Sequence, residues 1–197
     1  MSLLKSIQDG EGKTVEFKVE LPNGNTLAKT IIAFSNTGGG KLIIGVNDQG
    51  EIIGLEPDVN IFELKDKVAS IIYETCYPTV LPDIYTTTID DQLLLIIEVY
   101  RGNLLPYYLK NKGKNEGVYI RVGATNRKAS HENILELERQ RMNISFDQEA
   151  NREVELDSLD ISSLEGGFVR AGKVLDQPVM KNLQLVIEDN STLYPSN

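Results

Sequence analysis

The 197-residue sequence has little of the chemistry on which many small enzymes depend. It contains one cysteine, Cys76, one histidine, His131, and no tryptophan. A single cysteine excludes an intrachain disulfide and a zinc site built on several cysteines, and a single histidine argues against a Ser–His or Cys–His nucleophilic centre. We therefore expect any catalysis to depend on carboxylates, and a reducing, cytoplasmic setting is the simpler assumption.

Long hydrophobic runs are also missing. No apolar run approaches 18 residues, and the first residues show no basic segment followed by a long apolar stretch. Hydrophobic residues make up 41% and charged residues 25% of the chain, as in an average soluble domain. We expect a folded, soluble protein without membrane association, with one ordinary domain and an extension.

Basic residues are scarce overall but concentrated in one block. The chain has 20 Lys and Arg against 29 Asp and Glu, a net charge of −9, so the whole molecule should repel a nucleic-acid backbone. Residues 101–145 carry nine basic and four acidic side chains, whereas residues 1–100 and 146–197 are net −8 and −6. Any contact with DNA or RNA must therefore be local.

The hydrophobic pattern predicts an α+β fold with a mixed, mostly antiparallel sheet and about three packed helices. The expected main helices are one that Asn25 caps and Gly38 to Gly40 stop, 60–75, and one over 132–141 that Ser130 caps, with a short opening helix over 2–8. The expected strands are 14–19, 41–46, 51–55, 84–89, 93–100, 107–110 and 118–122. Turn residues favour two hairpins, 41–46 with 51–55 and 84–89 with 93–100.

The domain is expected to span residues 1–145. Residues 146–160 are acidic and polar, which is typical of a linker. Residues 161–197 have scattered apolar groups and end in a strand-like run, Leu183 to Ile187, without a following partner. We expect 146–197 to be a linker and the start of a truncated C-terminal region that continues past Asn197.

Three glycines before Lys41 invite comparison with a phosphate-binding loop. Such a loop precedes a helix, whereas Gly38 to Gly40 follow one, and Leu42 stands where a Walker A motif needs Ser or Thr. We interpret the glycines as a helix stop and a close turn, and expect no ATP site. Cys76 is expected to be a buried thiol, and His131 an exposed residue of a first helical turn.

Three carboxylates are candidate ligands for a hard divalent ion. Glu11, Glu16 and Asp48 would suit Mg²⁺ or Mn²⁺ and could activate water against a phosphodiester if the fold gathers them. Their spacing alone does not bring them together, because Glu11 and Glu16 differ by an odd number of residues. Residue statistics alone favour solvated surface carboxylates, and no cofactor is required unless the metal-dependent interpretation holds.

The basic block supplies the candidate nucleic-acid contacts. Its cations alternate with Tyr107, Tyr108 and Tyr119, a mixture that suits phosphate contacts combined with base stacking. A solvated hairpin with extended lysines explains the same pattern equally well. The predicted contact residues are Lys110, Lys112, Arg121, Arg127 and Lys128.

The combined motifs resemble the Schlafen-type AlbA-like (AlbA_2) domain. The resemblance extends over about residues 8–145. It is carried by the segments Val15 to Lys18, Ala33 to Asp48, Ile53 to Leu55, Tyr119 to Gly123 and Thr125 to Arg127.

The resemblance implies three functional readings. Similar bacterial proteins are described as transcriptional regulators or nucleic-acid-binding proteins, which makes a DNA- or RNA-binding module of a regulator our first hypothesis. Vertebrate Schlafen proteins cut structured RNA in a groove between two lobes, with acidic residues at the positions of Glu11, Glu16 and Asp48. A metal-dependent endoribonuclease is therefore the alternative, although Asn47 replaces a second acid and a homo-oligomer would be needed to supply the second lobe. The third reading is a protein-interaction scaffold, for which the overall acidity argues.

Overall fold

The computed structural model describes residues 3–142, 150–189 and 192–196. The chain divides into two compact units, Met1–Arg141 and Met142–Asn197. Residues 146–149 of the predicted linker lie outside the described residues. The first unit contains α1 (Leu3–Gln8), β1 (Val15–Lys18), α2 (Gly24–Asn36), β2 (Gly40–Ile44), α3 (Ile61–Thr75), β3 (Cys76–Tyr77), β4 (Asp83–Ile89), β5 (Gln92–Val99), β6 (Tyr108–Leu109), α4 (Gly113–Gly117), β7 (Tyr119–Val122), β8 (Thr125–Lys128) and α5 (His131–Met142).

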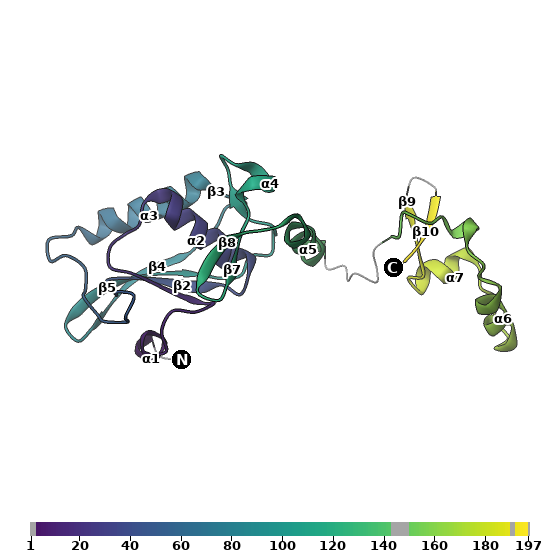
Figure 1. Ribbon diagram of the computed structural model, residues 1–197, viewed down its shortest axis with the longest axis horizontal. Coiled ribbons are helices and arrows are strands. Elements are labelled where there is room, and N and C mark those ends of the chain that lie inside the picture. Colours follow the sequence, from purple (N-terminus) through teal and green to yellow (C-terminus); the bar gives the residue numbers. More distant parts are fainter. Residues whose placement is uncertain (1–2, 143–149, 190–191, 197) are drawn as a thin grey trace. The chain divides into compact units, whose positions relative to one another are not determined.

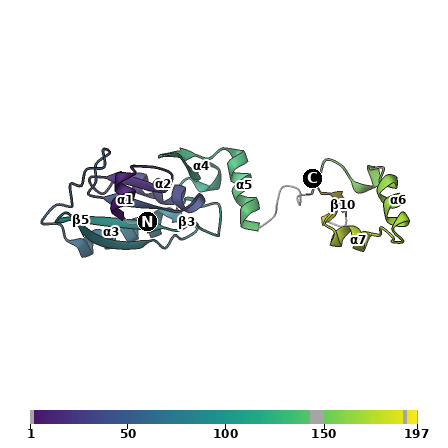
Figure 2. The ribbon, with the colours of Figure 1, turned by 90° about the horizontal axis from the view of Figure 1, so that it is seen from below.

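A four-stranded mixed sheet with the order β1-β2-β5-β4 forms the centre of this unit. β1 is parallel to β2, and the pairs β2–β5 and β5–β4 are antiparallel. Helices α2 and α3 lie on one face of the sheet and α1 on the other (Figure 1), and Figure 2 shows the same elements seen from below. The prediction of an α+β fold with a mostly antiparallel mixed sheet is confirmed.

The core has two layers because both faces of the sheet are covered. Leu42, Ile43 and Ile44 of β2 are all fully buried. Leu42 and Ile44 belong to the cluster under α2 and α3, whereas Ile43 packs in the smaller cluster on the α1 side. A continuous apolar run is what a central strand with two covered faces requires.

The three main helices lie where their apolar spacing predicts. The first begins two residues earlier than expected, because Asn23 rather than Asn25 caps it, accepting a hydrogen bond from the Thr26 N–H at 3.0 Å. At the third, Ser130 and Asn133 cap each other reciprocally: each side-chain oxygen accepts from the other's backbone N–H at 3.2 Å. Asn133 thus takes the place that Glu usually fills in a capping box.

The predicted hairpin between 41–46 and 51–55 forms only at its tip, where the Asn47 N–H donates to the Glu51 carbonyl and the Ile53 N–H to the Gly45 carbonyl. Residues 51–55 contribute a single bridge, between Val46 and Ile52. β2 already has β1 on one edge and β5 on the other, so neither edge is open to a hairpin partner. Gly45, at φ +102°, ends the strand and turns the chain away. The second predicted hairpin, β4 with β5, is confirmed.

The glycine run acts as a helix stop. Gly39 has φ +75°, and its N–H donates to the Phe34 carbonyl at 2.9 Å. A Cβ at Gly39 would lie 2.7 Å from the Val99 carbonyl oxygen, and one at Gly40 would lie 2.5 Å from the Phe34 ring. The structural interpretation of these glycines is therefore confirmed.

Two short segments near the basic block differ from expectation. The predicted turn 111–117 contains α4, a single helical turn. The segment after Val122, for which no strand was expected, forms β8 and pairs with β7 in a tight hairpin. β7 lies within the expected strand 118–122, whereas β8 is only four residues long and entirely polar, which gives little periodic signal.

The second unit is small and is described by itself. It contains η2 (Leu156–Ser158), α6 (Ser162–Arg170), α7 (Gln177–Asn182), β9 (Val186–Asp189) and β10 (Thr192–Pro195). The expected strand over 183–187 begins later, at Val186, and it has a partner, because β9 pairs antiparallel with β10. Within the described residues of the whole chain, no helix has the length and hydrophobicity needed to cross a membrane.

Candidate functional site

Arg121 lies at the centre of a buried polar network between β1 and the β7–β8 hairpin. Its side chain has no exposed surface, and that of Glu16 is 8% exposed. Arg121 Nη1 donates to Glu16 Oε2 and, at 2.9 Å, to Asn126 Oδ1. Nε and Nη2 donate to the Gly12 carbonyl at 3.1 and 3.0 Å, and Nη2 also donates to the Val15 carbonyl at 3.1 Å. The five N–H donors of the guanidinium thus all have acceptors.

Helix α2 completes this network. Thr30 Oγ1 donates to Glu16 Oε1 at 3.3 Å, and Asn126 Nδ2 donates to Thr30 Oγ1 at 2.9 Å. The guanidinium carbon of Arg121 lies 5.1 Å from the centroid of the Phe34 ring, a cation–π distance. The network ties the first strand, α2 and the hairpin together, which is a structural role.

The prediction that Arg121 contacts nucleic acid is therefore wrong for this fold. A guanidinium without exposed surface or a spare donor cannot reach a phosphate, and Glu16 neutralises its charge. The local pattern of cations could not show this, because the partner carboxylate lies 105 residues away in the sequence.

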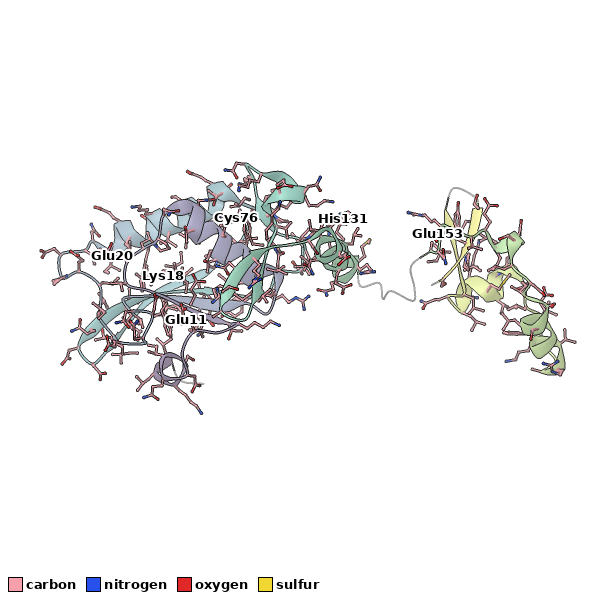
Figure 3. The ribbon with its side chains drawn as sticks, viewed as in Figure 1. Glu11, Lys18, Glu20, Cys76, His131 and Glu153 are labelled. Atoms are coloured by element: carbon pink, nitrogen blue, oxygen red, sulfur yellow. The ribbon has the colours of Figure 1, made fainter. Side chains whose placement is uncertain are left out.

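The three candidate carboxylates do not form a metal site. Glu11 Oε1 accepts a hydrogen bond from the Phe17 N–H at 2.7 Å and lies 3.9 Å from Lys18 Nζ, which in turn lies 3.5 Å from Glu16 (Figure 3). Asp48 is exposed in the turn after β2. In the described part of the chain, no group of three or more His, Cys, Asp or Glu side chains could hold a metal ion. The predicted Mg²⁺ or Mn²⁺ ligand set, and the catalytic role built on it, are not assembled.

Three of the predicted cations gather around the short helix α4. Lys110 and Lys112 follow β6, Lys128 ends β8, and all three are exposed. Lys128 pairs with Glu116 of α4. The hydrogen bond from Lys128 lowers the pKa of the Glu116 carboxyl, and the charge of Lys112 lowers it further. Lys112 and Lys128 thus act on one carboxylate, and Lys110 donates to the Tyr73 carbonyl. We call Lys110, Lys112 and Lys128 the α4 lysine surface.

Arg127 is exposed on the other face of the hairpin. The register pairs Arg127 with Ile120 and the preceding Asn126 with Arg121. Side chains alternate along a strand, so Arg127 points away from the buried network, whereas Lys128 leaves the strand on the network's side. The five predicted cations therefore do not share one face, although four of them are exposed.

The tyrosines of the basic block are mostly internal. Tyr107 and Tyr119 are buried, and Tyr108 is half-buried. Sequence reasoning missed Asn36, whose amide Nδ2 donates to the Tyr107 and Tyr119 carbonyls at 2.8 and 2.9 Å, while its Oδ1 accepts from the Tyr107 N–H at 2.7 Å. Asn36 fixes the two segments on either side of the α4 lysine surface. The sequence feature that could have identified Asn36 is its position inside the motif Ala33 to Asp48.

Cys76 is buried on the inner side of β3, and its position is labelled in Figure 3. Burial raises the pKa of the Cys76 thiol to about 11, which lowers the thiolate fraction at neutral pH by roughly a hundredfold. We expect a thiol reagent such as iodoacetamide to leave the native chain unlabelled and to label it rapidly in urea, as measured by mass spectrometry. Rapid labelling of the native chain would contradict the buried placement. His131 is exposed at the start of α5, as predicted.

Residues 11–130 match the family model described as Schlafen, AlbA_2. No curated protein matches the sequence.

Among solved structures, the chain is similar to the DIP2311 protein from Corynebacterium diphtheriae, with 20% sequence identity and a TM-score of 0.50. The similarity covers 93% of this chain but only 34% of that protein, so the chain spans about a third of its length. The N-terminal domain of a RecG-related protein from Nitrosomonas europaea has 24% identity and a TM-score of 0.46, over 65% of this chain and 91% of that domain. At these identities, the first similarity supports the fold alone.

Proposed function

Since the chain belongs to the Schlafen AlbA_2 family, we propose that it binds nucleic acid through the α4 lysine surface, with Arg127 as a further contact. The family match over residues 11–130 contains all four of these side chains. It also supports a nucleic-acid-related role in general.

The observation that carries this proposal is the excess of positive charge around α4. Lys112 and Lys128 act on Glu116, and Lys114 of α4 pairs with Glu138. Lys110 has no ion pair within the described residues, so the cations exceed the carboxylates here on a chain whose net charge is −9. Lysines bind phosphates as point charges and release counterions when they do so, which supplies affinity without reading sequence. A general backbone-binding module fits this arrangement.

The finer sequence-based readings stay predictions. These are a role in transcription, the choice between DNA and RNA, and the association of two chains. The endoribonuclease reading is not carried further, because Glu11, Glu16 and Asp48 are not gathered.

Removing two of the lysines should weaken binding and its salt dependence together. For the variant with Lys110→Ala and Lys112→Ala, we expect about tenfold lower affinity for labelled RNA or DNA at low salt. The slope of log affinity against log salt should fall by about 2, since each lost phosphate contact removes about 1. Fluorescence anisotropy across a salt series measures both quantities.

A charge-matched control separates local contacts from a general change in net charge. Lys65→Ala with Lys67→Ala removes the same charge from the first half of α3, outside the α4 lysine surface. Affinity should stay within twofold of the unmodified chain. Equal losses in the two double variants, or no binding by the unmodified chain, would overturn the proposal, and the latter would favour the scaffold reading.

A further inference from the structure

The two-stranded sheet β3–β6 presents aromatic side chains on one face. Cys76 pairs with Leu109, and Tyr77 pairs with Tyr108. Cys76 and Leu109 are buried in the core, so the strand alternation places both tyrosines on the opposite side. Their rings lie in contact, with centroids 5.3 Å apart and a tilt of 49°.

A third tyrosine extends this face from the end of α3. Tyr73 is 65% exposed and Tyr77 is 50% exposed. We call Tyr73, Tyr77 and Tyr108 the tyrosine face. Large exposed aromatic rings gathered at one place are typical of binding surfaces, because they offer contact area at a small cost in side-chain entropy.

A cation of the α4 lysine surface is held against this face. Lys110 Nζ donates to the Tyr73 carbonyl at 2.6 Å and lies 5.4 Å from the centroid of the Tyr73 ring. Lys112 is two residues further along the chain and exposed. The tyrosine face therefore adjoins fixed positive charge, which complements a polyanion better than an apolar protein surface.

Tyr73 lines a hollow in the protein surface. It has a volume of about 430 Å³, and Val80, Leu81 and Pro82 are among its lining residues together with Tyr73. Leu81 is itself largely exposed. The lining is mostly apolar and also includes Ser70 and Glu74. The hollow leaves room beside the exposed Tyr73 ring for a planar group such as an unstacked base.

We propose that the tyrosine face stacks on the bases of a single-stranded segment of nucleic acid, while Lys110 and Lys112 contact its phosphates. This inference rests on the proposed function and narrows its substrate class. Bases inside a duplex already stack on each other and hide their flat faces, whereas the bases of a single strand are open to aromatic side chains. Because every base can stack on an aromatic ring, we expect this surface to distinguish single strands from duplexes and not one base sequence from another.

The test measures how tightly the full chain binds one oligonucleotide as a single strand and as a duplex. The probes are a labelled RNA of about 12 nucleotides, a length within common single-strand site sizes, and the same RNA annealed to its complement. We expect Tyr73→Ala and Tyr77→Ala each to lower single-strand affinity about tenfold and to leave duplex affinity within twofold. Tyr73→Phe and Tyr77→Phe keep the ring and should bind like the unmodified chain.

Phe62→Ala is the matched control, because Phe62 is an 83% exposed aromatic residue on the same helix, near its start. It should leave both affinities unchanged. The chain has no tryptophan, so its intrinsic fluorescence comes from tyrosine, and stacking should quench it when the single strand is added. If an alanine variant fails to fold, the same fluorescence titration is made with the Phe variants, which keep the ring.

The outcomes separate this inference from the proposed function. If the lysine variants weaken binding but the tyrosine variants bind single strands normally, the stacking inference is overturned and nucleic-acid binding stands. The inference is also overturned if the tyrosine variants weaken duplex binding equally. If the unmodified chain binds neither probe, both proposals fail, and a protein becomes the remaining candidate partner for the tyrosine face.

Discussion

Arg121→Ala should lower the free energy of unfolding of the domain by about 3–5 kcal/mol, the range found when one partner of a buried ion pair is removed. The guanidinium fills the space between Glu16 and Asn126 and also binds the Gly12 and Val15 carbonyls. Its loss leaves the Glu16 carboxylate buried without a compensating charge. A loss of this size is a large part of the 5–15 kcal/mol that holds a typical domain together.

Urea denaturation followed by circular dichroism measures this effect. Arg127→Ala is the matched control, because Arg127 is the exposed arginine of the same hairpin and should change stability by no more than about 0.5 kcal/mol. Arg121→Lys should recover only part of the loss, since an ammonium has three donors where the guanidinium uses five. If Arg121→Ala is as stable as the unmodified chain but binds RNA poorly, the assignment of a structural role is wrong.

Asn36→Ala should destabilise the domain by about 3–6 kcal/mol. The substitution leaves the Tyr107 N–H and the carbonyls of Tyr107 and Tyr119 without their partner in a buried position. Each unsatisfied buried group costs about 1–3 kcal/mol. Thermal unfolding should show a correspondingly lower midpoint.

Ser35→Ala provides the comparison at the neighbouring position. Ser35 is equally buried, but its hydroxyl makes only a local bond to the Ile31 carbonyl of its own helix, at 2.9 Å. Its replacement should cost about 1 kcal/mol or less. Similar losses for the two variants would show that the bonds of Asn36 across to the Tyr107 and Tyr119 backbone contribute little.

The parts of the fold that could be predicted are those with a strong local pattern. Helix α3 shows its apolar residues at three- and four-residue steps, and Val68 and Ile72 are indeed fully buried. The β4–β5 hairpin combines a strand rich in β-branched residues and a continuous apolar strand with an Asp90–Asp91 turn whose residues both have positive φ. In these places local propensity and tertiary packing agree.

The failed predictions depended on information from distant parts of the chain. Residues 51–55 look like a strand, but β5 occupies the edge of β2 that they would need. Glu16 was expected on the solvent side of β1, yet Arg121 makes its burial favourable. Of the candidate site, the location in the basic block was predictable, whereas Tyr73 and Tyr77 come from another part of the sequence and could be added only by the fold.

The Glu16–Arg121 pair has a further consequence for the boundaries of the folding unit. It joins two segments near opposite ends of the family-matched region, and the intervening chain makes the central sheet. A fragment trimmed past Gly12 on one side or past Asn126 on the other would lose acceptors of the buried guanidinium. The smallest autonomous version of this domain must therefore keep both ends of this buried polar network, as well as Ile7 of α1 and Ile134 and Leu137 of α5, which belong to the core.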